Sequence, residues 1–199
     1  NGKTEVTLNV DIENKTDDFY AKSYSLALSN IDPINPSARI ETKSLPVFKE
    51  VKGEVVTLRV DFEEGILGKG SKRNFTITFE ENSFVTKTGE VWEISIPRLT
   101  DLSTFRNYGV TLIVPNNLGT EAYLSPDAKN REVIGDSTKY FFEKDAVSKV
   151  GISAGFGEFQ VFSFNLKYHL ENPIPTSTQV EIALPPDTAF QRLYYESIS

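Results

Sequence analysis

The sequence of 199 residues contains no cysteine, no methionine and a single histidine, His169. Without cysteine the chain has no thiol nucleophile, no disulfide and no thiolate ligand for zinc or an iron–sulfur cluster. His169 is therefore the only imidazole that could serve a Ser-His-Asp triad. Because it follows Tyr168 at the end of an alternating run, we interpret it as an ordinary strand residue.

Positive charge is also scarce. Lys and Arg number 21 against 28 Asp and Glu, which gives a formal net charge of −7. A protein needs a surplus of Lys and Arg to neutralise phosphates, so we expect no nucleic-acid partner and no docking to anionic lipid. No apolar run approaches the roughly 20 residues of a membrane-spanning helix, and we expect no membrane contact by this segment itself.

Neither end of the sequence has the features of a complete protein. The chain begins at Asn1 without methionine, and the first residues have neither the basic nor the apolar region of a signal peptide. The last residues, from Tyr194 on, stop inside a strand-like pattern. We therefore expect the chain to be a segment of a longer protein.

Aromatic residues make up 12% of the whole sequence, and a period of two is its dominant pattern. Apolar and polar residues alternate in runs that predict half-buried strands. These runs are Val6–Ile12, Tyr20–Leu28, Val56–Phe62, Phe75–Phe79, Trp92–Ile96, Tyr108–Val114, Phe156–Leu170, Val180–Leu184 and Phe190–Ile198. The longest of them, Phe156–Leu170, is expected to bend near Gly155 or Gly157.

The spacing of turn signals between these runs predicts an all-β fold of antiparallel, immunoglobulin-like β-sandwiches. We expect at most one or two short helices; the best candidate is Lys144–Val150, capped by Asp145 and ended by Gly151. The stretch from Pro97 to Asn107 has no clean period. We place a domain boundary there, between residues 1–98 and 99–199; the alternative is one continuous large sandwich.

An acidic cluster of Asp11, Glu13, Asp17 and Asp18 surrounds one predicted turn. Calcium favours oxygen-rich loops, but the EF-hand spacing with glycine at position six and glutamate at position twelve is missing. We interpret the cluster as solvated turn carboxylates and predict no metal site.

Two pairs of neighbouring acids, Glu63–Glu64 and Glu80–Glu81, could suggest a glycosidase. That reaction needs two carboxylates facing each other across a cleft, whereas neighbours on a strand point to opposite faces. We interpret the pairs as charges that end edge strands and discourage aggregation. We predict no catalytic residue and no cofactor, and no motif indicates which residues bind a partner.

Other local patterns have a structural and a functional interpretation. Gly65–Gly70 lacks the ending of a phosphate loop and predicts a hairpin connection. The glycines of Gly151–Gly157 predict a close approach of the backbone to the other sheet, or to a ligand. Asn14 and Asn74 fit the glycosylation pattern, which is frequent by chance. Trp92 is expected in the core, although it could stack on a sugar.

Several longer strings carry a resemblance to a known family. They are Val91-Trp-Glu-Ile-Ser-Ile-Pro97, Gly151-Ile-Ser-Ala-Gly-Phe-Gly-Glu-Phe-Gln160, Tyr168-His-Leu-Glu-Asn-Pro173 and Glu181-Ile-Ala-Leu-Pro-Pro-Asp-Thr-Ala-Phe-Gln191. Together they resemble the β-rich region that precedes the transglutaminase-like domain in large membrane-anchored bacterial proteins. The resemblance is closest over residues 90–199.

The resemblance implies a non-catalytic, extracellular or cell-surface module whose partner is the transglutaminase-like domain of its own polypeptide. That family uses a Cys-His-Asp triad, and this sequence has no cysteine to carry it. The implied role is a structural spacer or a protein-interaction module, with a surface protein as a further possible partner. A carbohydrate-binding module, with a glycan as partner, is the alternative; an enzyme that uses carboxylates alone is a third hypothesis.

Overall fold

The computed structural model describes residues 2–99, 103, 105–158, 164–173, 175–186 and 193. The chain divides into a first unit, Asn1–Glu158, and a second unit, Phe159–Ser199. All strands of the described residues lie in the first unit, and they pair only in antiparallel fashion. The predicted all-β antiparallel sandwich is confirmed. In this described part, the helices are a 3₁₀ turn at Asn116–Leu118 and α1 at Lys144–Val147.

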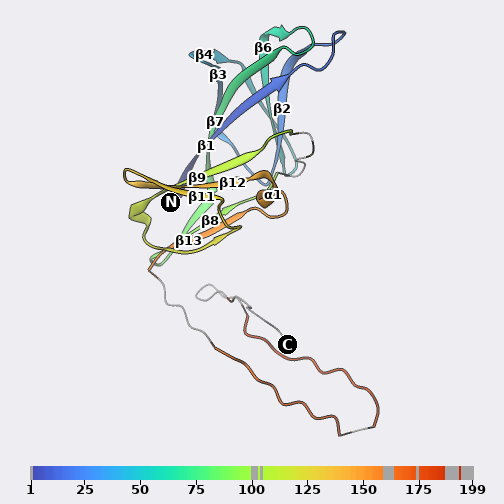
Figure 1. Ribbon diagram of the computed structural model, residues 1–199, viewed down its shortest axis with the longest axis vertical. Helices are drawn as coiled ribbons and strands as arrows, with labels where there is room; N and C mark the ends of the chain where they lie inside the picture. The colour runs from blue at the N-terminus through green and yellow to red at the C-terminus, as the bar shows by residue number, and fades with distance from the viewer. Residues whose placement is uncertain are drawn as a thin grey trace. The chain divides into compact units, whose positions relative to one another are not determined.

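The first sandwich is built from two facing sheets (Figure 1). One sheet contains β1 (Gly2–Glu13), β7 (Lys72–Thr88), β3 (Ile34–Ile40) and β4 (Lys43–Leu45). The other contains β2 (Ala21–Ser29), β6 (Val55–Ile66) and β5 (Val47–Lys52), with β6 in the middle.

The core of the first sandwich follows directly from the alternation of the sequence. Leu58 and Val60 on β6 are fully buried, and Phe75 and Ile77 on β7 are at most 3% exposed. Phe75 meets the edge of the Phe62 ring at a centroid distance of 5.3 Å. Since successive side chains of a strand point to opposite faces, each strand contributes one apolar row to the space between the sheets.

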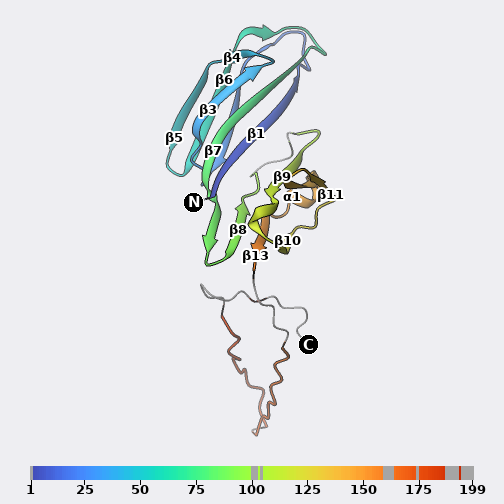
Figure 2. The ribbon, with the colours of Figure 1, turned by 90° about the vertical axis from the view of Figure 1, so that its left-hand side faces the viewer.

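The second sandwich repeats the two-layer arrangement with shorter strands (Figure 2). One layer contains β8 (Val91–Ile96), β13 (Ile152–Gly157) and β10 (Glu121–Ser125). The other contains β9 (Gly109–Pro115), β12 (Ser137–Glu143) and β11 (Asn130–Ile134). Tyr140 and Phe142 from β12 and Ile152 from β13 are the largest fully buried side chains of its core.

β7 belongs to both sandwiches. Its first part pairs with β1 and β3, and its last residues, from Val85 to Thr88, pair with β8. Val85 on β7 and Ile96 on β8 pack against both clusters of buried side chains. Figure 2 shows β7 running from one group of strands into the other. The boundary placed between residues 98 and 99, and its alternative of one continuous sandwich, stay predictions.

Two local predictions about connections are wrong. Gly65–Gly70 is not a hairpin, because β6 and β7 belong to different sheets and the segment crosses between the layers. The helix begins at Lys144, as predicted, directly after β12, but it ends at Val147 and not at Val150. Glu143 therefore occupies the N-cap position without a side-chain bond, and Asp145 lies inside the first turn.

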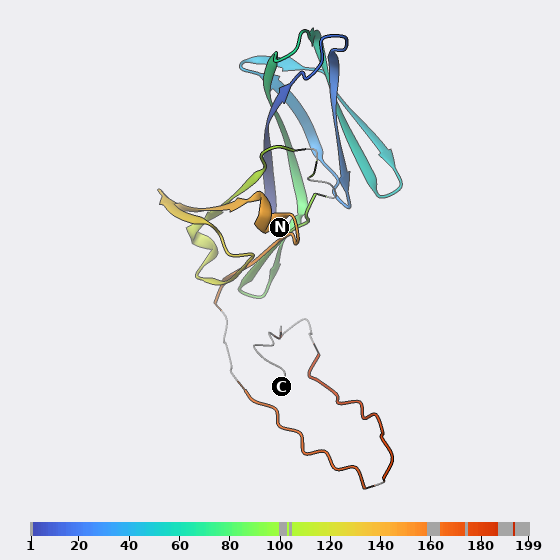
Figure 3. The same ribbon diagram turned by 45° about the vertical axis from the view of Figure 1, so that its right-hand side comes forward.

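The prediction of a long strand over Phe156–Leu170 is also wrong. β13 ends at Gly157. In the second unit residues 164–173 form a first arm and residues 175–186 a second arm, both without strand pairing in their described part (Figure 3). The run Val180–Leu184 lies in the second arm. The run Phe190–Ile198 lies outside the described residues, apart from Leu193.

Candidate functional site

At one end of the first sandwich a single side chain fastens two loops together. Asn14 Nδ2 donates to the carbonyl oxygens of Phe19, at 2.8 Å, and Ile66, at 2.9 Å. Its Oδ1 accepts from the backbone N–H of Thr16 at 2.9 Å. The backbone N–H of Asn14 donates to the carbonyl of Ser71 at 2.9 Å. We call these two loops, residues 14–20 and 67–71, the loop end.

The loop end exposes large apolar side chains. Phe19 is 75% exposed, Leu67 64% and Tyr20 48%. The Tyr20 ring lies against Gly65, where an added Cβ would come within 2.3 Å of a ring carbon. Any larger residue at position 65 would displace this ring. The backbone is thus held in place while apolar side chains point to solvent, which is an arrangement typical of residues that bind another molecule.

An open groove of about 830 Å³ lies among β1, the turn between β3 and β4, β6 and the start of β7. Charges of both signs line it: Lys43 forms an ion pair with Glu63, and Arg73 donates to the carbonyl of Glu64 at 2.7 Å. The aromatic ring in its lining belongs to Phe75, which is 3% exposed. The groove can form hydrogen bonds, but it presents no ring on which a sugar could stack.

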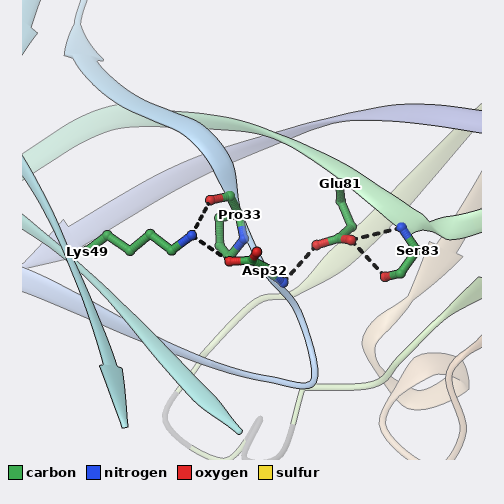
Figure 4. Close-up of polar contacts among 5 residues, drawn as sticks. All are labelled: Asp32, Pro33, Lys49, Glu81 and Ser83. Carbon is green, nitrogen blue, oxygen red and sulfur yellow. Dashed lines mark hydrogen bonds and ion pairs between the residues drawn. The ribbon is translucent and has the colours of Figure 1, made fainter. Parts of the chain in front are cut away.

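A buried carboxylate fastens another loop to β7 (Figure 4). Glu81 is 3% exposed and accepts hydrogen bonds from the backbone N–H groups of Asp32 and Ser83, both at 2.9 Å, and from the Ser83 hydroxyl at 2.7 Å. Lys49 donates to the Asp32 carboxylate at 2.5 Å and to the carbonyl of Pro33 at 2.8 Å. All these groups are used in holding the loop, so we assign them a structural role.

This network corrects the interpretation of Glu80–Glu81 as the charged end of an edge strand. Both residues lie in the middle of β7, which has neighbours on both sides. Glu80 points to the surface and pairs with Lys3 at 2.7 Å, whereas Glu81 points inward. The sequence contains no local signal for the difference, because the partners of Glu81 include a loop 49 residues away.

A smaller polar pocket of about 260 Å³ lies in the second sandwich. The Tyr140 hydroxyl donates to Glu121 at 2.7 Å, and Arg131 lies 3.4 Å from the same carboxylate. Burial, with a further contribution from this hydrogen bond, raises the pKa of Tyr140 to about 12. Tyr140 therefore stays protonated at neutral pH and is neither a general base nor a nucleophile.

The carboxylates of the acidic cluster, Asp11, Glu13, Asp17 and Asp18, do not meet in one site. Glu13 pairs with Lys15 at 2.5 Å, and the hydrogen bond from this ammonium lowers the pKa of Glu13. Asp17 accepts from the backbone N–H of Lys69 at 3.3 Å and so helps to fasten the loop end. Within the described ranges, no group of three or more His, Cys, Asp or Glu side chains could hold a metal ion.

The remaining candidates, His169, Trp92 and Asn74, lie on different elements of the chain. His169 lies in the first arm with its side chain 87% exposed, and its Nε2 is 2.9 Å from Glu171 Oε1. It is therefore an exposed residue but not the strand residue that was predicted. Trp92 is half-buried against the core of the second sandwich, with Lys87 Nζ 5.5 Å from its ring centroid. Asn74 is exposed on β7.

The glycines of Gly151–Gly157 approach their own sheet and a neighbouring loop, not the facing sheet as predicted. A Cβ on Gly155 would lie 2.4 Å from the ring of Tyr123, on the paired strand β10. A Cβ on Gly151 would lie 2.2 Å from the Ile96 carbonyl oxygen. Protein atoms thus occupy the space next to these glycines, and no ligand is needed to explain them.

A comparison with protein-family models and with curated proteins finds no match to this sequence. No helix in the part of the chain that the structure describes has the length and apolar character needed to cross a membrane.

Proposed function

We propose that this chain is a non-catalytic β-sandwich region of a transglutaminase-like protein at the cell surface, where it serves as a structural spacer or a protein-interaction module. The strings quoted above resemble that region, and the all-β fold agrees with the resemblance. The polar clusters of the described residues are engaged in holding loops and strands, which supports a role without catalysis.

The observation that carries the interaction role is the loop end. Phe19 and Leu67 are the most exposed of its apolar side chains, and Asn14 fixes the backbone from which both project. A side chain on a fixed backbone loses little conformational freedom when it is buried by a partner. Apolar and aromatic anchors of this kind contribute much of the binding free energy at protein interfaces.

The proposal predicts that the purified chain has no transglutaminase chemistry. Incubated with a glutamine-rich protein and a primary amine, the chain should release no ammonia and form no cross-links above a buffer control. Activity that copurifies with the chain and is lost in the His169→Ala variant would overturn the proposal. The coding sequence around this segment gives a second test, because it should contain a domain with a Cys-His-Asp triad.

If the loop end is the interaction surface, the chain should bind the separately purified transglutaminase-like domain through it. Replacing Phe19 and Leu67 by serine should weaken the affinity about tenfold or more in calorimetry, since two apolar anchors are lost. Val133→Ser is the matched control, because Val133 is 65% exposed on β11, away from the loop end. Equal weakening by both variants, or wild-type affinity in the loop-end variant, would contradict the assigned surface.

A carbohydrate-binding module remains the second candidate, and one observation favours it. Phe19 and Tyr20 are adjacent rings, 75% and 48% exposed, and exposed rings are what sugar stacking requires. A glycan array with the wild-type chain and the Tyr20→Ala variant tests this candidate. Binding that the substitution removes would support it, and an empty array would eliminate it.

A further inference from the structure

The two sandwiches of the first unit share β7, and the pairing of this strand is irregular where it passes from one to the other. β3 pairs with β7 as far as Glu80, and β8 pairs with it from Val85 on. Between Glu81 and Val85, β7 advances by four residues while its partner β1 advances by only two. β7 therefore contains a bulge at residues 82–84, which we call the junction bulge, and a bulge bends the strand that carries it.

The junction bulge changes which residues of β7 face the core. Before it the inward positions alternate regularly and end at Phe79 and Glu81, each 3% exposed. The next inward residue is Phe84, at 5% exposure, whereas Ser83 is exposed. Val85 follows and packs against the cores of both sandwiches. The conformation of the bulge therefore sets the direction in which β7 enters the second sandwich.

The Glu81 carboxylate ties the junction bulge to the rest of the first sandwich (Figure 4). Its Oε1 accepts from the backbone N–H and from the hydroxyl of Ser83, inside the bulge, at 2.9 Å and 2.7 Å. Its Oε2 accepts from the backbone N–H of Asp32, in the loop between β2 and β3, at 2.9 Å. Lys49 on β5 holds the Asp32 carboxylate in turn. Hydrogen bonds thus connect the bulge with both sheets of the first sandwich.

The residue type at position 81 is explained by these bonds and not by core packing. Burying a carboxylate is unfavourable unless hydrogen bonds replace its water. An apolar side chain would continue the inward row of Ile77 and Phe79, but it would accept no hydrogen bond. Glu81 accepts three, and hydrogen bonds to a charged acceptor are strongest where water is excluded.

We infer that the Glu81 carboxylate locks the junction bulge and thereby fixes the angle between the two sandwiches of the first unit. When its hydrogen bonds are removed, the junction becomes a hinge: each sandwich keeps its own core, and the two sandwiches sample a range of relative orientations. The lock involves neither the loop end nor a partner molecule. Its test is therefore independent of the proposed function.

Distance measurements between two spin labels on the full chain test the inference. Because the sequence has no cysteine, the labels react only with introduced cysteines. Ser25→Cys on β2 and Thr111→Cys on β9, both at exposed positions, report the separation of the two sandwiches. Glu81→Gln keeps the size and shape of the side chain, but its amide nitrogen accepts no hydrogen bond. In this variant the distribution of label distances should become at least about twofold wider than in the chain with Glu81.

Glu80→Gln is the matched control. It is the same substitution at the neighbouring residue, whose side chain points to the surface and pairs with Lys3. The distribution of distances in this variant should be as narrow as with the native residue. Ser83→Ala removes one of the three hydrogen bonds at an exposed position, so the chain stays folded and the width should be intermediate.

A second pair of labels distinguishes a hinge from unfolding. Ser25→Cys and Arg39→Cys lie at exposed positions in the two sheets of the first sandwich, and their distance distribution should be equally narrow with and without Glu81→Gln. Three outcomes would overturn the inference. They are an unchanged width for the first pair in Glu81→Gln, equal broadening in Glu80→Gln, and broadening of the second pair to the same extent as the first.

Discussion

In β7, Phe75, Ile77 and Phe79 are at most 3% exposed, whereas Val180, Ile182 and Leu184 of the second arm are 39–59% exposed. Both segments alternate apolar and polar residues with the same period. β7 has β1 on one side and β3 or β8 on the other, while the arms have no ladder in their described part. Alternation therefore decides which side chains share a face, and pairing to neighbours decides whether that face is buried.

The largest expected effect compares an isoleucine in each region. Ile77→Ala in β7 should lower the free energy of unfolding by about 3–4 kcal/mol, since a fully buried side chain leaves a cavity between packed sheets. Ile182→Ala should lower it by less than about 0.5 kcal/mol, because Ile182 is 39% exposed in an arm without strand pairing in its described part. Urea unfolding followed by circular dichroism measures both values. Similar losses would show that the second arm is packed against the rest of the chain.

The second comparison uses a glutamate in each region. Glu81→Ala should lower the free energy of unfolding by about 2–3 kcal/mol, because it removes the acceptor of the partly buried N–H groups of Asp32 and Ser83. Glu181→Ala, on the exposed face of the second arm, should change stability by no more than about 0.5 kcal/mol. A small effect of Glu81→Ala would mean that water replaces the carboxylate, and hydrogen exchange at Asp32 would reveal this.

The smallest effect is a dependence on alkaline pH. Burial raises the pKa of Tyr140 from 10.0 to about 12 in the folded chain, so the neutral hydroxyl is favoured by folding. The resulting stabilisation, on the order of 2 kcal/mol, is complete below pH 10 and is lost as the pH rises from 10 to 12. The free energy of unfolding, measured at intervals across this range, should fall much less steeply with pH in Tyr140→Phe than in the wild type.

Tyr168→Phe in the first arm is the control for this pH dependence, because the Tyr168 side chain lies in an exposed segment. In this variant the free energy of unfolding should fall with pH between 10 and 12 as steeply as in the wild type. Burial also raises the pKa values of Tyr24 and Tyr108, so a smaller slope of the same sign should remain in Tyr140→Phe. A wild-type slope in Tyr140→Phe would assign the whole effect to those two tyrosines.

The sequence predicts strands well where one face is uniformly apolar. The predicted runs Val6–Ile12 and Phe75–Phe79 lie within β1 and β7, and Tyr108–Val114 largely coincides with β9. β12 was not predicted, because Tyr140, Phe141 and Phe142 are consecutive rings and hide the period of two; only Phe141 of the three points outward, at 39% exposure.

β3 was missed for a different reason. Its sequence contains Pro36, which donates no hydrogen bond, and Asn35, whose φ of 51° interrupts the extended backbone. The pairing of β3 with β7 is accordingly irregular between Ile34 and Ser37. Pairing with a neighbour 41 residues away, as between Ser37 and Thr78, outweighs the weak local preference.

The candidate site was harder to predict than the fold. Asn14 was noticed only as part of a short glycosylation pattern, but its amide holds Phe19 and Ile66 in place. One of these partners is 52 residues away in the sequence, so nothing near Asn14 indicates the role. The exposure of Phe19 and Leu67 was equally hidden, since composition does not tell an exposed ring from a buried one.

β7 has a mechanical consequence for the first unit. At about 3.3 Å per residue a strand of its 17 residues spans at most roughly 55 Å, and β7 passes through both sandwiches with an irregularity between Glu81 and Val85, where its pairing with β1 shifts. A tensile load applied between the two ends of this unit is borne by one continuous backbone and its lateral hydrogen bonds, not by a flexible hinge. This continuous strand therefore limits how far the loop end can move relative to β13.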